Sequence, residues 1–289
     1  MTVSILIQCG VVSLLSAAVY ALVALGFNLI TGIMKIVNFA HGHLVVLGMY
    51  LTIFLWGRVG IDPYLLLIIT LPAAFCIGVF LHKIFVERIL NSPELCQFTL
   101  TLGIMILLEN LMLIIFGGNI QGLNTWYTSK SIMLGKAISI NYAKLFSLFV
   151  SIGTIGGLYC LLHKTRFGKA MRAAADDKDG AALLGIDISR IFTVSFGLSV
   201  ALAAVAGTSA ITFTVVTPFA GLGLTLKSFI IVVLGGVGSI WGMILGSLLL
   251  AGVETVGSLF LSPGISQGLA LLILIIMIVA KPRGLLGAE

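Results

Sequence analysis

Residues 269–280 read LALLILIIMIVA, twelve apolar residues without interruption. Similar runs recur along the 289-residue chain, which is 60% hydrophobic and only 9% charged. A water-soluble domain carries about a quarter charged residues, so this composition excludes one. The continuous runs also differ from the alternating strands of an outer-membrane β-barrel. The sequence therefore predicts an all-α membrane protein.

A membrane-spanning helix needs roughly 20 apolar residues, which leaves room for about eight to ten spans. Polar interruptions between the apolar runs predict nine spans. They lie near residues 3–30, 39–56, 64–82, 96–117, 145–162, 191–213, 219–236, 240–260 and 266–280. The seventh could instead be re-entrant, which would leave eight. We expect a single domain over residues 1–289, a polytopic bundle of about 8–9 transmembrane helices with some broken helices. Because the N-terminus lacks the basic region of a cleavable signal, we expect the first helix to be retained.

The distribution of Lys and Arg predicts the orientation, because short loops rich in these residues stay in the cytoplasm. With the N-terminus outside and the C-terminus cytoplasmic, eleven of the sixteen Lys and Arg fall in inner loops and four in outer loops, and Lys227 lies within the membrane. This bias accounts for the formal net charge of +6. Nucleic acid is therefore not expected as a partner.

Isolated cysteines and histidines give no metal-binding pattern. His41 and His43 have no carboxylate or cysteine near them in the sequence, so we expect them to be hydrogen-bonding helix residues near the inner surface. The four cysteines stand alone without CxxC spacing and are typical of small apolar fillers. They are Cys9, Cys76, Cys96 and Cys160.

Two connections are long enough to do more than turn the chain. The outer one, residues 118–144, contains Trp126 and Tyr127, which favour an interfacial aromatic belt over contact with an external partner. The inner one, residues 163–190, predicts two short helices, over 166–175 and from about Gly180. Thr165 is expected to cap the first, Asp177 and Asp179 the second, and Gly185 to end it.

Small and apolar residues recur at helical spacing in this inner loop, beside basic residues that could pair with acids of a partner. Such a surface fits a groove on another protein. The alternative is an amphipathic helix lying on anionic lipid.

Three blocks of the sequence resemble the LivH-type permeases of ABC importers for branched-chain amino acids. The first is ALGFNLITG at 24–32, followed by IVNFAHG at 36–42 and Gly48. The second is TRFGKAMRAAADD at 165–177, followed by ALLGI at 182–186, and the third is LGGVGSIWG at 234–242 with Gly246. Urea and short-chain amide permeases share much of this pattern, so the exact solute stays open.

The resemblance implies a non-catalytic subunit of the bacterial inner membrane. Its partners would be a second permease, expected to be a paralogue, two cytoplasmic ATPase subunits that bind ATP and Mg, and a periplasmic solute-binding protein. The sequence agrees on one point, because Gly135-Lys136 and Gly168-Lys169 are each followed by Ala and form no phosphate-binding loop. No cofactor is expected on this chain. The residues expected to couple it to the ATPases are Arg166, Gly168, Lys169, Arg172, Ala174, Asp177, Ala182 and Gly185.

Transporters often place the solute path at broken helices that recur as an inverted repeat. A shift of about 190 residues lays Asn38 on Ser228 and Gly48 on Gly238. The alternative is that glycine-rich apolar helices look alike by composition. The candidates for the translocation path are Asn38, Phe39, Gly42, Ser228 and Gly236.

Three charged residues, Glu109, Lys227 and Glu254, fall inside predicted spans. Each costs roughly 2.5–3.5 kcal/mol at the bilayer centre, so each needs a partner or water. We interpret Lys227 as the neutralising partner of Glu109 or Glu254, with a structural role. The competing hypothesis is an ion-coupled secondary transporter in which they bind ions or protons. An integral-membrane enzyme is not favoured, because no catalytic constellation is evident.

Overall fold

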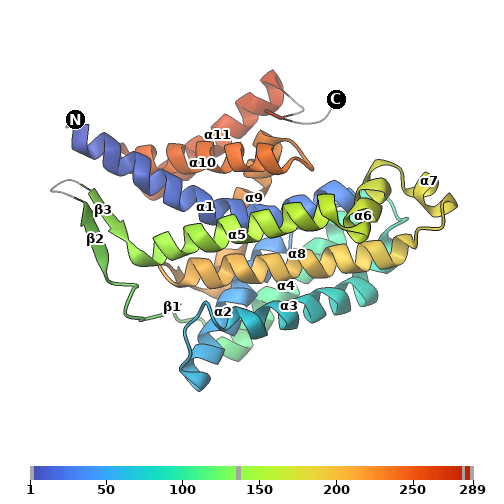
Figure 1. Ribbon diagram of the computed structural model, residues 1–289, viewed down its shortest axis with the longest axis horizontal. Coiled ribbons are helices and arrows are strands. Elements are labelled where there is room, and N and C mark those ends of the chain that lie inside the picture. Colours follow the sequence, from blue (N-terminus) through green and yellow to red (C-terminus); the bar gives the residue numbers. More distant parts are fainter. Residues whose placement is uncertain (1–2, 135–137, 282–283, 287–289) are drawn as a thin grey trace.

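The computed structural model describes residues 3–134, 138–281 and 284–286 (Figure 1). These residues form eleven α-helices. They are α1 (Val3–Met34), α2 (His41–Val59), α3 (Leu67–Leu81), α4 (Glu94–Phe116), α5 (Tyr142–Lys164), α6 (Arg166–Asp176), α7 (Lys178–Leu183), α8 (Ile188–Ile211), α9 (Gly221–Gly235), α10 (Ile240–Phe260) and α11 (Pro263–Ala280). A π-helical turn (His82–Val86) and a 3-10 turn (Glu87–Ile89) extend α3, and a 3-10 turn (Pro218–Ala220) leads into α9.

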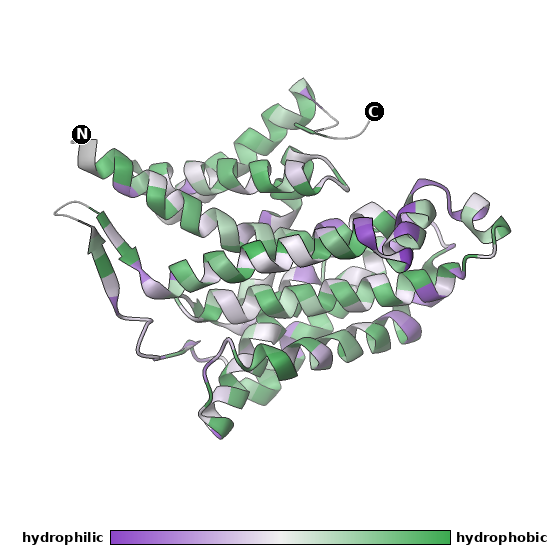
Figure 2. Ribbon diagram, in the orientation of Figure 1, coloured by the Kyte–Doolittle hydropathy of each residue, from purple (hydrophilic) through white to green (hydrophobic). Residues whose placement is uncertain are grey.

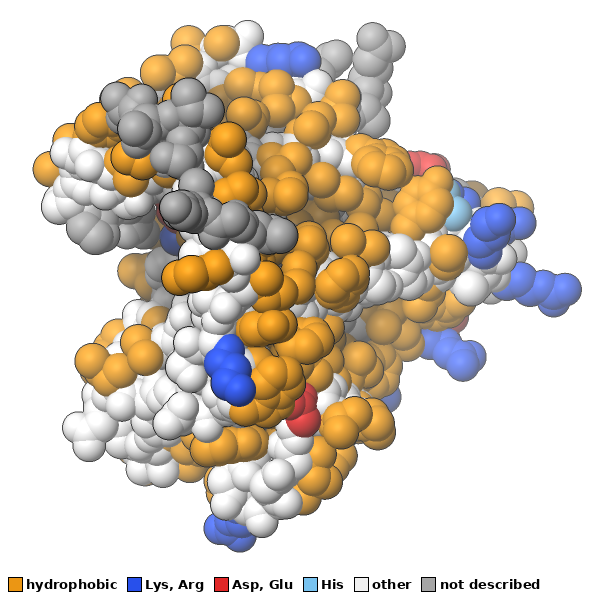
Figure 3. Space-filling model, turned by 60° about the vertical axis from the view of Figure 1, so that its left-hand side comes forward, with side chains coloured by type: hydrophobic (Ala, Val, Ile, Leu, Met, Phe, Trp, Pro, Cys, Tyr) orange, Lys and Arg blue, Asp and Glu red, His pale blue; other side chains and the backbone are white. Residues whose placement is uncertain are grey.

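Within the described residues, eight helices are long and apolar enough to cross a membrane, and α11 is a shorter apolar helix. Hydrophobic residues run along all of these helices, whereas hydrophilic residues gather near α6 and in the turns (Figure 2). Exposed side chains on the spans are themselves apolar, as at Ile68 and Ile114, and hydrophobic side chains spread over the outer surface in Figure 3. The chain is therefore a multi-pass membrane protein, and the all-α prediction is confirmed.

Helix α8 is the centre of the bundle and is buried along nearly its whole length. Its extensive contacts with α1, α2 and α3 depend on small residues. A Cβ at Gly48 would lie 2.6 Å from the Cα of Ala204 on α8, and one at Gly207 would overlap the carbonyl oxygen of Val45. Small residues that let backbones approach closely are the usual basis of helix packing in membranes, where no hydrophobic force drives helices together.

The helix contacts follow an inverted repeat. Exchanging α1 with α8, α2 with α9, α3 with α10 and α4 with α11 maps the two most extensive contacts, α1 with α10 and α3 with α8, onto each other. It also maps the contact of α4 with α2 onto that of α11 with α9. Helices α2 and α9 are the second and seventh spanning helices. Because four spans lie between them, they cross the membrane in opposite directions, and one is inverted relative to the other.

The register predicted for this repeat is wrong. Helix α2 begins at His41 and α9 at Gly221, which corresponds to a shift of 180 residues rather than about 190. Gly238, which the sequence aligned with Gly48, lies in the turn after α9. The short matches reflected the common glycine-rich composition of these helices, while the helix starts set the actual correspondence.

The connection between α4 and α5 lies at the opposite end of the molecule from α6 and α7 (Figure 1). It carries two short antiparallel pairings that the sequence did not predict. Strand β1 (Gln121–Gly122) pairs with β4 (Val215–Val216), and β2 (Ser131–Leu134) pairs with β3 (Ile138–Asn141).

The aromatic-belt interpretation is wrong for Tyr127, which is fully buried against the ring of Tyr64, whereas Trp126 is 60% exposed. Burial raises the pKa of the Tyr127 phenol, so this side chain stays neutral inside the connection.

We expect Gly207→Ala to destabilise the bundle by roughly 1–3 kcal/mol, because the added methyl group overlaps the backbone of α2. The matched control is Gly103→Ala on α4, where a Cβ meets nothing within 4 Å. Thermal unfolding in detergent measures both. An unchanged Tm for Gly207→Ala would contradict the close α2–α8 contact.

Candidate functional site

The chain turns back into the bundle between α1 and α2. The Nε2 atom of His41 donates a hydrogen bond of 2.8 Å to the carbonyl of Val23, eleven residues before the end of α1. That position is about 16 Å from the helix end. His41 and His43 are hydrogen-bonded as expected, but the prediction that they lie near the inner surface is wrong. They lie near the middle of the bundle, where the broken helix α2 starts.

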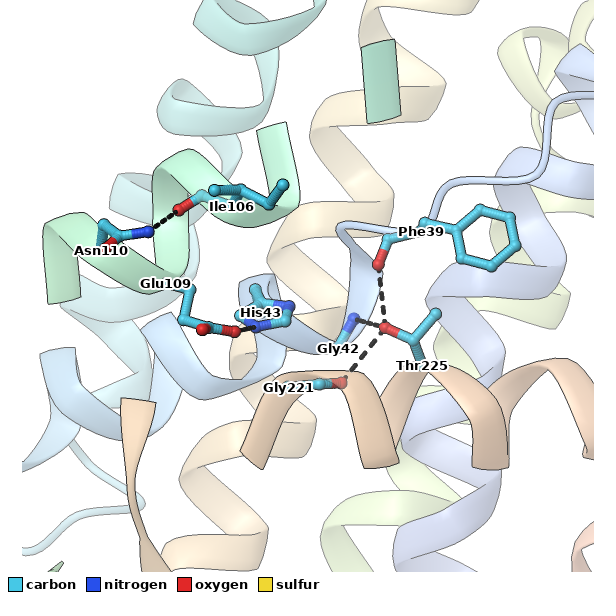
Figure 4. A network of polar contacts seen from close by, with 8 residues as sticks. All are labelled: Phe39, Gly42, His43, Ile106, Glu109, Asn110, Gly221 and Thr225. Atoms are coloured by element: carbon cyan, nitrogen blue, oxygen red, sulfur yellow. Dashed lines mark hydrogen bonds and ion pairs between the residues drawn. The ribbon is translucent and has the colours of Figure 1, made fainter. Parts of the chain in front are cut away.

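The starts of α2 and α9 meet at this depth (Figure 4). The N–H of Gly42 donates to the Thr225 hydroxyl at 2.9 Å, and that hydroxyl lies 3.0 Å from the carbonyl oxygen of Phe39 and 3.2 Å from that of Gly221. A Cβ at Gly42 would overlap the Gly221 carbonyl. Glycine at position 42 therefore allows the two helices to meet, and Thr225 joins them.

Four of the five path candidates lie around this crossing. Asn38 is buried and accepts a hydrogen bond from the N–H of Ala40 at 3.1 Å. Phe39 packs edge-on against Phe98, and Ser228 is buried on the turn of α9 after Thr225, where its hydroxyl donates to the carbonyl of Leu224. Their role in solute passage stays a prediction.

The fifth candidate, Gly236, lies elsewhere. It follows the last residue of α9, about 22 Å along the helix from Gly221. Its φ of 102° ends the helix, and Gly284 of the C-terminal segment packs against it. Gly236 is therefore separated from the crossing, and its backbone conformation accounts for the glycine.

Glu109 on α4 pairs with His43 on α2. The Nε2 atom of His43 lies 3.0 Å from the Glu109 carboxylate, and His43 is fully buried while the Glu109 side chain is 29% exposed. His43 also packs against the start of α9, because a Cβ at Gly221 would overlap its ring. Beside this pair, the exposed Asn110 donates to the carbonyl of Ile106 at 2.8 Å.

Lys227 pairs with Glu254, one of the two partners suggested for it. Its Nζ atom lies 2.8 Å from the Glu254 carboxylate and 2.8 Å from the hydroxyl oxygen of Tyr20. The Tyr20 hydroxyl donates to the same carboxylate, and the ammonium lies 4.5 Å from the centre of the Tyr20 ring. The cluster joins α1, α9 and α10 and leaves no net charge.

The α6–α7 loop forms two capped helices. The Thr165 hydroxyl accepts the N–H of Gly168 at 2.9 Å, and the Asp177 carboxylate accepts that of Asp179 at 3.0 Å. The second helix begins at Lys178, two residues earlier than predicted. Gly185, with φ 83°, ends it as predicted.

The loop candidates divide into buried and exposed residues. Gly168 and Ala174 are buried, and a Cβ at Gly168 would overlap the backbone of Leu161 on α5. These two residues fix α6 to the bundle, and their role in coupling to the ATPases stays a prediction. The exposed candidates are Arg166, Lys169, Arg172, Asp177, Ala182 and Gly185.

Residues 11–280 match the family described as the branched-chain amino acid transport system / permease component. The chain belongs to this permease family. The permease is 30% identical over 284 residues to the high-affinity branched-chain amino acid transport system permease protein LivH of Escherichia coli, covering 93% of this chain and 91% of LivH. It is equally similar to BraD of Pseudomonas aeruginosa, at 30% over 285 residues, with 93% and 91% covered.

A more distant relative, the autoinducer 2 import system permease protein LsrC of Yersinia enterocolitica, is 36% identical over 54% of this chain and 44% of its own. No solved structure matches the permease. In the part of the permease that the structure describes, no group of three or more His, Cys, Asp or Glu residues could hold a metal ion.

Sequence reasoning missed Thr225, His43 and Tyr20 as partners in these contacts. Thr225 lies one helical turn from Ser228, so a polar residue at i−3 was an available signal. His43 and Tyr20 gave no such signal, because their partners lie 66 and 234 residues away.

We expect Thr225→Val to slow solute transport at least several-fold while the permease still folds, because valine keeps the shape but cannot bond the N–H of Gly42 or the carbonyl of Phe39. Thr225→Ser keeps the hydroxyl and should retain most of the rate. Uptake in proteoliposomes measures both. Equal rates for the two variants would show that the hydroxyl does not position the crossing.

We expect Lys227→Met and Glu254→Gln each to lower the yield of folded permease. Lys227→Met leaves the Glu254 carboxylate without its partner, and Glu254→Gln leaves the Lys227 ammonium without its partner. An unpaired charge costs about 2.5–3.5 kcal/mol in the membrane. The double exchange Lys227→Glu with Glu254→Lys should restore folding. Size-exclusion chromatography in mild detergent measures the yield. Unaffected single variants would contradict a structural role for the pair.

Proposed function

We propose that this permease is the membrane subunit of an ABC importer for branched-chain amino acids in the bacterial inner membrane. ATP hydrolysis in two partner ATPase subunits, which bind ATP and Mg, drives it. It pairs with a second, paralogous permease and receives solute from a periplasmic binding protein. The subunit itself carries out no catalysis and binds no cofactor.

The observation that carries this proposal is the exposed end of α7. Leu183 and Leu184 are 91% and 83% exposed at the end of a polar loop. Neighbouring apolar side chains exposed in this way mark a surface that binds another protein. The turn that follows them is rigid, because the N–H of Ile186 bonds the carbonyl of Ala181 and that of Gly185 bonds Ala182. A rigid apolar tip of this kind fits a groove on an ATPase.

Helix α6 connects this tip to the bundle. Met171 is fully buried and Ala174 nearly so, and α6 contacts α1, α5 and α8. A movement of the ATPases would therefore reach the central helices as a rigid-body motion. Among the exposed candidates, Asp177, Ala182 and Gly185 lie at or beside α7, and Arg166 lies at the first residue of α6.

The charge distribution supports an N-terminus outside and a cytoplasmic C-terminus. Lys and Arg are concentrated in the loop that contains α6 and α7, and the positive-inside rule assigns this end to the cytoplasm. That end is where ATP and the ATPases are found.

The polar groups of the membrane interior suit a neutral or zwitterionic solute. Lys227 and Glu254 neutralise each other, and the Glu109 carboxylate is held by a hydrogen bond from His43, so these charged groups of the membrane interior are engaged by the protein itself. The named solutes of LivH and BraD support branched-chain amino acids, while LsrC shows that a related permease serves another solute.

We expect Leu183→Asp combined with Leu184→Asp to reduce recovery of the ATPase subunits with the tagged permease at least tenfold, and to abolish ATP-driven uptake. Burying two carboxylates in an apolar groove has a large desolvation cost. The control is Met133→Asp, which places a carboxylate on an apolar residue that is 79% exposed at the opposite end of the molecule. Full recovery with the double variant would contradict docking through α7.

Proteoliposomes containing the whole complex and its binding protein test the solute. We expect uptake of leucine, isoleucine and valine to require ATP, and urea and acetamide not to compete. Competition by urea or acetamide would assign the permease to the amide branch of its family. Uptake without ATP that collapses with an ionophore would instead indicate an ion-coupled transporter.

A further inference from the structure

A cavity of about 910 Å³ lies where α6 meets the ends of α1 and α5 and the start of α10. Its volume falls within the range of about 300–1,000 Å³ typical of small-molecule sites. Lys169 and Arg172 of α6 and His163 of α5 line it, and Asp176 is the one acid among its lining residues. Neither Lys169 nor Arg172 has a carboxylate within 4 Å among the described residues.

The start of α10 adds to the positive potential of this cavity. Residues 237–241 line it, so the N-terminus of a 21-residue helix lies at its wall. The positive end of a helix dipole favours anions. Two unpaired cations and the helix end together favour an anionic group here.

Helices α1, α5 and α10 also line an apolar groove beside the cavity. A second hollow, of about 320 Å³, is lined by small and apolar residues of α1, α5 and α10, among them Ala17, Ala18, Gly156 and Leu248. From His163 in the cavity to Leu148 in this groove, α5 rises about 22 Å. One leaflet of a bilayer with its headgroups is about 20–22 Å thick. The cations and the groove therefore span one leaflet, with the charge at the surface end.

We propose that the groove along α1, α5 and α10 binds a phospholipid with an anionic headgroup, whose phosphate lies between Lys169 and Arg172. The acyl chains lie along the small residues of α1 and α5. Trp241, which is 65% exposed at the rim of the cavity, lies at the boundary between headgroups and hydrocarbon, a position that Trp prefers. This inference goes beyond the proposed function and does not depend on it.

A bound lipid of this kind would connect α6 to α10 through its headgroup. Two of the groups around the anion, Lys169 and Arg172, belong to α6, which leads to the exposed tip of α7. The third, the N-terminus of α10, belongs to the bundle. Lys169 and Arg172 then act on the lipid, while docking to a partner falls to α7.

Trp241 provides the test. In a permease with Trp56→Phe and Trp126→Phe, assembled with partner subunits whose own tryptophans are also replaced by phenylalanine, it is the one tryptophan left. The intact complex is placed in vesicles of phosphatidylcholine to which phosphatidylglycerol or phosphatidylcholine with brominated acyl chains is added, and quenching of Trp241 reports the lipid in the groove. We expect brominated phosphatidylglycerol to quench at an about fivefold lower concentration than brominated phosphatidylcholine. The lining has a net positive charge of one, which attracts an anionic lipid by about 1 kcal/mol, and this free energy corresponds to about that ratio.

The double variant Lys169→Gln with Arg172→Gln should abolish this preference. The matched control, Lys83→Gln with Arg88→Gln, removes two exposed charges that do not line the cavity and should retain it. Equal quenching by the two brominated lipids overturns the proposal even if the double variant fails to fold. Quenching by neither lipid would show that protein covers the groove and would overturn the proposal. Relief of quenching by inorganic phosphate would also overturn it, because the cations would then bind a soluble anion.

Discussion

The close approach of helix backbones is the constraint on which the rest of this permease depends. At Gly42 and Gly207 the neighbouring backbone occupies the place of a Cβ, so α2 is held against both α9 and α8. In a bilayer such contacts replace the hydrophobic effect, because lipid is as apolar as the helix surface. The meeting of the two broken helices follows from the approach at Gly42, where the N–H of α2 and the Thr225 hydroxyl of α9 bond to each other.

The charged groups inside the bundle have polar partners within the protein. Glu109 uses His43, and Lys227 uses Glu254 with Tyr20 between them. Each pair joins helices that are distant in sequence. The Lys227–Glu254 ion pair removes the cost of two lone charges in the membrane, and the His43 imidazole gives the Glu109 carboxylate a hydrogen-bond partner. The crossing of α2 and α9 itself is built from hydroxyl, amide and backbone groups.

The α6–α7 loop could be predicted in detail because its signals are local. Thr165 and Asp177 cap helices that start within three residues of them, and Gly185 ends a helix through its own backbone conformation. Which of the neighbouring alanines of α6 is buried could not be predicted in the same way. Residues 173–175 are consecutive alanines, and only the packing of α6 on α5, α1 and α8 makes Ala174 the buried one.

The sequence by itself determined the membrane-spanning helices, their approximate ends and the capped loop, because hydropathy, chain length and capping are properties of neighbouring residues. Only the tertiary structure decided that Glu109 pairs with His43, that α2 and α9 correspond at a shift of 180 residues, and that Gly236 lies away from the crossing. Those features join residues far apart in the chain. In a membrane protein both the interior and the lipid-facing surface are apolar, so hydropathy does not show which face of a helix meets which neighbour.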